Sequence, residues 1–441
     1  MKKYFLFMFF FLFVLSVNAG EGRYTLPLTG GGWSLWLDKE ASWQNDRLYL
    51  PHEITDLSLL PVNCPTGGWQ VLSNNPDAVS VEVPGTVEEY LTVSDNPRPE
   101  DFRGVSWWYR KIKIPADQKN KRFIIYFESV RMRAEVYLDG KLMAYDLIGE
   151  TPFQVDITDE AKPGTEQLLA VRVTNPGGNF HWQDFDILKW GEYNIPPARS
   201  FSGIIGRVRL ESVNPVFISD IYMQNTPELT KVNAIVSFTN ETPADVKQDV
   251  ELTVSEKANP DKVVFRQTLK KVSFPSGNHE VTIPVNVPDA KLWDLSTPEL
   301  YTCNIQIKKG KKILDQDQKN FGFRWFTVDG VGKDAVLRLN GRRVMLRSAI
   351  SWGYFPVTGL IATTEMAEKQ ILTAKKLGLN MLNFHRCIGS PVVLEKADEL
   401  GLLYYEEPGS FHSANHDPFI RTIVNEKLKL LAGGILYSPH F

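Results

Sequence analysis

The chain has 441 residues, of which 43% are hydrophobic and 12% aromatic, and its formal net charge is −3. This length and composition are typical of about three domains, each with its own apolar core, and the charge excludes the basic surface that a nucleic-acid-binding protein carries. The three cysteines, Cys64, Cys303 and Cys387, lie too far apart for a disulfide framework, so we expect buried thiols.

The first residues have the pattern of a secretory signal peptide. Lys2 and Lys3 precede an unbroken apolar run over residues 4–15, and Ala19 provides a small residue at the exit. We therefore expect residues 1–19 to be removed and the protein to be exported, to the periplasm or outside the cell. The apolar run is too short for a membrane-spanning helix and does not recur, so we expect no membrane contact after cleavage.

The first half of the mature chain has the pattern of a β-sandwich. After a loop-rich opening that includes Gly30–Trp33, apolar and polar residues alternate in short runs at 107–114, 122–128, 134–138, 142–147, 153–157 and 167–174. Turn residues separate the runs, and Asp139-Gly140 is typical of a two-residue hairpin. From 216 to 328 the strands continue without a helix signal, at a spacing typical of an immunoglobulin-like sandwich.

The last third changes to a repeated pattern of helix, glycine and apolar strand. In the first unit Thr364 is the expected helix cap, Gly378 ends the helix, and a strand covers 379–384. One face of this helix is apolar, formed by Ala367, Ile371, Ala374 and Leu377. In the second unit Ser390 caps a helix that starts at Pro391 and stops at Gly401, and a strand covers 402–405.

Strands that are apolar on both faces and follow amphipathic helices predict a parallel sheet covered by helices, here part of a (β/α)8 barrel. Such barrels carry their chemistry at the carboxyl ends of the strands. The residues expected there are His385, Arg386, Glu406 and Glu407.

Five ordered motifs in the first half resemble those of the domain that opens glycoside hydrolase family 2, the β-galactosidase, β-glucuronidase and β-mannosidase group. They are Trp108-Tyr109-Arg110, Phe127-Glu128-Ser129-Val130, Asp139-Gly140-Lys141, Pro152-Phe153 with Asp156-Ile157-Thr158, and Ser202-Gly203-Ile204 with Val208 and Leu210. The resemblance continues through Leu292-Trp293, Pro298 to Tyr301, Gly322-Phe323-Arg324 and the hairpin at 339–347. It implies a sugar-binding jelly roll at 20–215, an immunoglobulin-like sandwich at 216–328, and the first part of a catalytic barrel at 329–441.

The resemblance implies a retaining mechanism, which needs two carboxylates about 5–5.5 Å apart. In the family the acid/base is the Glu of an Asn-Glu pair after the fourth barrel strand, and the nucleophile is a Glu after the seventh. If 341–347 holds the first strand, 379–384 the second and 402–405 the third, the chain stops before both positions. We therefore assign no catalytic residue.

Two sequence features imitate the missing carboxylates. Glu406 and Glu407 are neighbours, and neighbours on a strand point to opposite faces, so at most one lines a pocket. Val424-Asn425-Glu426 matches the Asn-Glu pair, but Ile420, Ile423, Val424 and Leu428 have helical spacing, which predicts a helix instead.

The candidate substrate-binding residues are Trp352, which follows the first strand, and His385, Arg386, Glu406 and Glu407. Each is equally compatible with a structural place at a barrel rim. The galactosidase metal pattern falls on Phe411-His412-Ser413, so we expect no metal and no cofactor. The loop 177–186 mixes aromatic and acidic residues, which suits a sugar ring, although a packed loop would have the same composition.

Three interpretations follow. In the leading one the chain represents a glycosidase that acts on O-glycosidic bonds of β-linked sugars. This copy is expected to be catalytically incomplete, because Gly433-Gly434 and Pro439 interrupt the barrel pattern, as after a frameshift or premature stop. In the second it is a non-catalytic carbohydrate-binding protein that uses its jelly roll. In the third a separate chain completes the barrel. In all three the partner is a carbohydrate.

Overall fold

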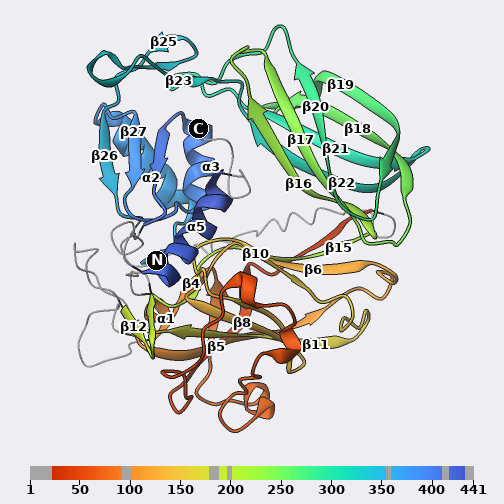
Figure 1. Ribbon diagram of the computed structural model, residues 1–441, viewed down its shortest axis with the longest axis vertical. Helices are drawn as coiled ribbons and strands as arrows, with labels where there is room; N and C mark the ends of the chain where they lie inside the picture. Colours follow the sequence, from red (N-terminus) through yellow and green to blue (C-terminus); the bar gives the residue numbers. More distant parts are fainter. Residues whose placement is uncertain are drawn as a thin grey trace, which may run out of the picture.

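The computed structural model describes residues 22–91, 102–177, 188–195, 201–353, 355, 359–409 and 417–432. Figure 1 shows three parts, which are two β-sandwiches and a smaller α/β segment packed against both. The expected signal peptide and most of the loop 177–186 lie outside the described residues. Within them, no helix is long and apolar enough to cross a membrane.

The first sandwich packs a four-stranded sheet against a six-stranded sheet. The smaller sheet has the order β1-β15-β6-β10 and the larger has the order β3-β2-β5-β11-β8-β9, with antiparallel neighbours throughout. The strands are β1 (Tyr24–Pro27), β2 (Gly30–Asp38), β3 (Val79–Val83), β5 (Gly104–Lys113), β6 (Arg122–Phe127), β8 (Arg133–Leu138), β9 (Lys141–Asp146), β10 (Phe153–Asp156), β11 (Glu166–Asn175) and β15 (Val208–Val213). Inward residues of both sheets form one buried core, which includes Trp33, Trp108, Ile125, Val136 and Leu210.

Short elements complete this sandwich. β4 (Gly85–Thr86), β14 (Gly203–Ile204) and β7 (Val130–Arg131) form a small sheet, and β12 (Leu188–Trp190) pairs with β13 (Tyr193–Ile195). The helix α1 covers Val87–Tyr90, and single 3-10 turns cover Pro51–Glu53, Leu57–Leu59 and Trp69–Ser73.

All six strands predicted in this region are present, within three residues of their expected ends. The hairpin at Asp139-Gly140 is also confirmed, because both residues have the positive φ of a tight turn, 49° and 86°. The expectation of a loop at Gly30–Trp33 is wrong, since these residues begin β2. Glycines carry no strand preference, but here they form a bulge, with a register shift between Gly30 and Trp33 against β3.

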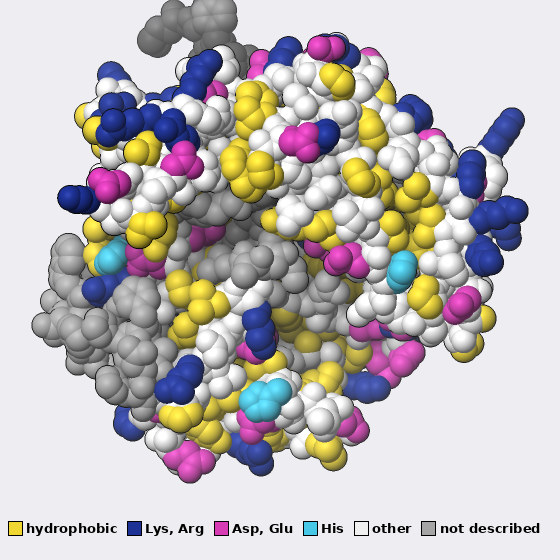
Figure 2. Space-filling model, turned by 45° about the horizontal axis from the view of Figure 1, so that its top comes forward, with side chains coloured by type: hydrophobic (Ala, Val, Ile, Leu, Met, Phe, Trp, Pro, Cys, Tyr) yellow, Lys and Arg dark blue, Asp and Glu magenta, His cyan; other side chains and the backbone are white. Residues whose placement is uncertain are grey.

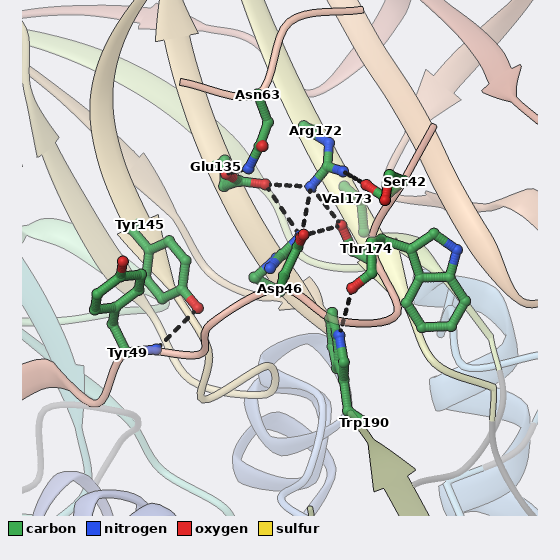
Figure 3. A network of polar contacts seen from close by, with 12 residues as sticks. Ser42, Asp46, Tyr49, Asn63, Glu135, Tyr145, Arg172, Val173, Thr174 and Trp190 are labelled. Atoms are coloured by element: carbon green, nitrogen blue, oxygen red, sulfur yellow. Dashed lines mark hydrogen bonds and ion pairs between the residues drawn. The ribbon is translucent and has the colours of Figure 1, made fainter. Parts of the chain in front are cut away.

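A buried ionic network fixes a long loop to the outer face of the larger sheet (Figure 3). Arg172 on β11 donates to Glu135 on the neighbouring β8 at 2.6 Å, and Arg133 donates to Asp46 of the loop at 2.5 Å. Asn63, further along the loop, donates to the other oxygen of Glu135 at 2.6 Å. Two guanidinium groups balance two carboxylates, which makes burial of the charges tolerable.

Cys64 lies in the same covering loop and is exposed, so the expectation of a buried thiol is wrong for this residue. A loop that covers a sheet faces solvent on its outer side. Cys303 and Cys387 are buried, as expected.

The second sandwich has no helix among its described residues, as predicted. Its sheets have the orders β16-β17-β20 and β19-β18-β21-β22. The strands are β16 (Val216–Asn225), β17 (Lys231–Asn240), β18 (Val246–Glu256), β19 (Asn259–Phe274), β20 (Gly277–Asn286), β21 (Tyr301–Lys309) and β22 (Lys312–Phe321). Its core, which includes Phe238, Leu252, Ile283 and Ile305, is separate from that of the first sandwich.

A small antiparallel sheet leads to the α/β segment. It consists of β23 (Phe326–Asp329), β24 (Val336–Leu339) and β25 (Arg342–Arg343), with a 3-10 turn at Gly332–Asp334. The hairpin predicted here is confirmed, and Asn340 and Gly341 turn it with φ of 52° and 77°.

The α/β segment contains the predicted parallel sheet, with order β26-β27-β28. Its strands are β26 (Ser348–Ser351), β27 (Met381–Phe384) and β28 (Leu403–Glu406), and its helices are α2 (Thr364–Lys376), α3 (Pro391–Leu400) and α5 (Pro418–Ala432). No closed barrel is present among the described residues. The first parallel strand is β26 and not the stretch 341–347, because Arg342 and Arg343 pair antiparallel with β24.

Two details of the predicted helices need correction. The cap of α2 is Thr363, whose hydroxyl accepts from the Met366 amide at 3.2 Å, and not Thr364. Leu377 is 73% exposed and does not share the buried face of Ala367, Ile371 and Ala374, because the helix ends before it. α3 begins at Pro391 and ends at Gly401 with φ of 75°, as predicted.

The helix α5 contains the Asn425-Glu426 pair, so the helical prediction for this stretch is confirmed. Phe419 and Ile423 pack against Leu50 and Ile148 of the first sandwich. Lys427 forms an ion pair with Glu150 of that sandwich at 3.0 Å. The α/β segment is thus attached to the first sandwich by its last described helix (Figure 1).

The two sandwiches are joined through Arg23. This guanidinium donates to Asp315 at 2.9 and 3.1 Å and to Glu211 at 2.8 Å, and its side chain is only 9% exposed. Asp315, on β22, also accepts from the Ile218 amide at 2.7 Å. Removing the arginine would leave buried carboxylates without their counter-charge.

We therefore expect Arg23→Ala to destabilise the junction of the sandwiches by about 3 kcal/mol or more, the usual cost of breaking a buried ion pair. Scanning calorimetry should show a lower melting temperature, or separate transitions where the wild type has one. The matched control is Arg338→Ala, which removes an exposed pair with Asp329 and should cost less than about 1 kcal/mol. Equal effects of the two variants would contradict this account of the junction.

Candidate functional site

The parallel register of the three strands brings the predicted site residues together. Ser351, Phe384 and Glu406 are aligned across β26, β27 and β28, so the segments that follow them meet at one edge of the sheet. The Trp352 and His385 rings are in edge-to-face contact, with centroids 4.7 Å apart and planes at 87°. All five candidate substrate-binding residues lie at this edge.

Glu407 holds the turn that follows β27. Its Oε2 accepts from the Arg386 amide at 2.9 Å, and its Oε1 accepts from the Asn383 side-chain amide at 3.2 Å and lies 3.3 Å from His385 Nδ1. Only 11% of its side chain is exposed. The carboxylate therefore favours the His385 tautomer with a proton on Nδ1, and it leaves the other ring nitrogen as an acceptor.

The turn itself requires this support. Arg386 has φ of 61°, a left-handed conformation that is unfavourable for a residue with a side chain. A Cβ atom on Gly409 would lie 2.7 Å from the Arg386 carbonyl oxygen, so only glycine fits at position 409. The carboxylate of Glu407 and the close approach of Gly409 together keep His385 and Arg386 at the strand ends.

Glu406 holds a later part of the same loop. Its Oε1 accepts from the Gly389 amide at 2.8 Å, and burial raises the pKa of this carboxyl from about 4.5 to about 7. A Cβ on Gly389 would collide with the Phe384 ring at 2.4 Å, so glycine is needed for this approach. The prediction that at most one of these neighbouring glutamates lines a pocket stays a prediction.

Two polar residues that the sequence reasoning missed connect the site to its surroundings. Asn383 donates to Glu407, and the signal for it was an amide within an otherwise apolar strand. Gln370 of α2 donates to the Ser351 hydroxyl at 3.1 Å and accepts from Tyr404 at 3.3 Å. A glutamine on a helix gave no comparable signal, because its partners are distant in the chain.

The position of α3, and hence of β28, depends on the second sandwich. Trp293 donates its indole N–H to the Asp398 carbonyl at 2.8 Å, and Arg324 donates to the Asp398 carboxylate at 2.9 Å. The guanidinium also lies over the Trp293 ring, 4.5 Å from its centroid. The motifs Leu292-Trp293 and Gly322-Phe323-Arg324 therefore hold the helix that precedes Glu406.

No group of three or more His, Cys, Asp or Glu side chains in the described ranges is arranged to hold a metal ion. His412, where the galactosidase metal pattern falls, lies outside these ranges.

The raised pKa of Glu406 predicts a pH-dependent stability. The folded protein keeps this proton to higher pH than the unfolded chain does, so stability should fall as pH rises from about 4.5 to about 7. Glu406→Gln keeps an oxygen acceptor for the Gly389 amide without the charge. We expect the variant to lose less stability than the wild type between pH 5 and pH 8, and to melt at a higher temperature at pH 8.

Thermal melts across this pH range provide the measurement. Glu228→Gln, at an exposed site, is the control and should follow the wild type. Burial also raises the pKa of Asp146, to about 6, and this too lowers stability as pH rises. Some decline of stability with pH should therefore remain in Glu406→Gln. A decline as steep in Glu406→Gln as in the wild type would contradict the burial of a protonated Glu406.

Comparison with known proteins identifies relatives of the whole arrangement. The family model "Glycosyl hydrolases family 2" matches residues 216–324. A β-glucuronidase from Formosa agariphila is 25% identical over 369 residues, which is 76% of this chain and 37% of the relative. A β-galactosidase from Thermoanaerobacter pseudethanolicus is 28% identical over 335 residues, which is 75% of this chain and 43% of the relative.

Solved structures agree on the fold. A glycosyl hydrolase family 2 member from Bacteroides cellulosilyticus superposes with a TM-score of 0.70 at 20% identity, over 92% of this chain and 50% of that protein. The chain thus spans about 40% of the length of these two curated relatives. The family model, the curated relatives and the solved structures together support a place for this chain in glycoside hydrolase family 2.

Proposed function

We propose that this chain forms the two β domains and the first part of the catalytic barrel of an exported β-glycosidase. In this proposal residues 1–19 are the signal peptide, 20–215 a sugar-binding jelly roll, 216–328 an immunoglobulin-like domain and 329–441 the start of a (β/α)8 barrel. The observation that carries the proposal is the cluster of Trp352, His385, Arg386 and the two glutamates at the ends of three parallel strands, where barrel enzymes bind substrate.

The site is suited to bind a sugar. An indole ring suits stacking on a pyranose face, and the free nitrogen of His385 and the Arg386 guanidinium suit hydroxyl or carboxylate oxygens. The relatives are a β-glucuronidase and a β-galactosidase, so we propose a β-linked glycoside as the ligand and an O-glycosidic bond as the target.

The described glutamates do not form the pair that hydrolysis requires. A retaining glycosidase places its acid/base and its nucleophile on opposite sides of one bond, about 5–5.5 Å apart. Glu406 and Glu407 are successive residues, and their carboxylates already bind the main-chain amides of Gly389 and Arg386 in the loop that follows β27. We assign them to binding and support, with the catalytic carboxylates outside the described residues.

We expect the purified chain to bind methyl β-glycosides without hydrolysing aryl β-glucuronides or β-galactosides, because neither carboxylate of the pair is in place. His385→Ala should weaken binding about tenfold, the value of one good hydrogen bond and a ring contact. Binding is measured by saturation-transfer NMR titration and turnover by release of nitrophenol.

The control is His52→Ala, at an exposed position in the first sandwich, which should bind like the wild type. Turnover that a substitution within this chain abolishes would contradict the incomplete site. Binding that survives His385→Ala would place the sugar elsewhere and would favour the second interpretation, a carbohydrate-binding protein that uses its jelly roll.

A further inference from the structure

A large cavity lies away from the strand ends, where both sandwiches meet α3. Its volume is about 990 Å³, at the upper end of the range of ligand sites. β6 and β10 form one wall, the outer face of β16, β17 and β20 forms the second, and α3 forms the third. Figure 2 shows the molecule hollowed where its three parts meet, with acidic side chains beside the hollow.

Two ion pairs on α3 span the cavity. Glu395 binds Arg207 of the first sandwich at 2.6 Å, and Glu399, one turn later, binds Lys257 of the second sandwich at 2.7 Å. Arg207 is also bonded to Glu128 at 2.7 Å. These cations are therefore already neutralised by carboxylates of the cavity itself.

Acidic side chains outnumber basic ones in the lining. Seven carboxylates line the cavity, from Glu128, Asp220, Glu280, Asp317, Glu395, Asp398 and Glu399, against four cations, from Arg207, Arg209, Lys257 and Lys319. Burial raises the pKa of Asp220 and of Asp317. Asp317 and Asp398 are paired with Arg23 and Arg324, which lie outside the lining, so five carboxylates remain beside four cations and no cationic surplus is left for an anionic ligand. Since no metal-binding group of three ligands occurs among the described side chains, these acids do not form a metal centre.

The uncharged lining suits a polyhydroxylated ligand. Hydroxyl and amide groups project from both sandwiches, including those of Gln154, Ser219, Ser237, Thr239, Asn278 and Asn320. Each sandwich also contributes an aromatic ring, Phe153 from β10 and Tyr222 from β16, both half-buried. Rings that stack on sugar faces, beside amides and carboxylates that bond hydroxyls, are the groups that recognise neutral sugars.

We propose that this cavity is a second carbohydrate site, which binds a neutral oligosaccharide between the two sandwiches and α3. The inference rests on the proposed carbohydrate function, but it assigns a site separate from the strand ends. Because the ligand would contact all three parts, its binding would also strengthen their association.

Calorimetric titration of the full chain with cellohexaose, xylohexaose and β-1,4-galactotetraose tests the proposal, with tetragalacturonate as the anionic comparison. We expect at least one neutral oligosaccharide to bind and tetragalacturonate to bind at least tenfold more weakly. Tyr222→Ala should weaken binding of the neutral oligosaccharide at least tenfold. Ser237→Phe, which fills the cavity without removing packing, should do the same and guards against a folding defect in the first variant.

His385→Ala distinguishes this site from the strand ends. Binding of the oligosaccharide that survives His385→Ala but not the two cavity substitutions supports the proposal, whatever the outcome for methyl glycosides. Binding lost in His385→Ala and kept in both cavity variants would overturn it. Failure of all three neutral oligosaccharides to bind, or tighter binding of tetragalacturonate, would overturn it as well.

Discussion

The arrangement of the site depends on one residue of α3, Asp398, and on the way the second sandwich holds it. Its carbonyl and its carboxylate are both bonded, to Trp293 and Arg324, and all three side chains are almost completely buried. α3 leads directly through Gly401 into β28, whose end carries Glu406 and Glu407. The second sandwich thereby fixes the direction in which β28 continues from α3. This explains why two motifs without chemistry, around Trp293 and Arg324, mark the chain so clearly.

Ion pairs join the parts, beside small apolar clusters. Arg23 joins the sandwiches, Lys427 attaches α5 to Glu150, and Glu395 and Glu399 connect α3 to both sandwiches. Buried ion pairs add little net stability compared with apolar packing, but a charge left without its partner is costly. Such contacts therefore select one relative placement of the parts over others. The two separate apolar cores supply the stability, and the ionic contacts supply the geometry on which a cavity between parts depends.

The local pattern of the sequence was sufficient to predict the strands and helices. It was insufficient to predict the contacts between residues that are far apart in the chain. The parallel sheet, the start of α3 at Pro391 and the end at Gly401 follow from periodicity and capping, which act within a few residues. The cap of α2 was misplaced by one residue because Thr363 and Thr364 are equally suitable in sequence. Gly30–Trp33 was misjudged because a bulge is defined by its partner strand. Asn383, Gln370 and the Asp398 contacts were missed because their partners lie at least 19 residues away in the chain.

The two adjacent glutamates show how neighbouring residues of one type acquire different chemistry. Glu407 accepts a main-chain N–H and a side-chain amide and faces an imidazole. Glu406 has one main-chain donor and is otherwise buried, so its pKa rises to about 7 and it is protonated in mildly acidic solution. Then Glu406 is a hydrogen-bond donor at the strand end while Glu407 remains an acceptor. A sugar hydroxyl both donates and accepts, so a protonated Glu406 offers such a hydroxyl a donor where a carboxylate could only accept.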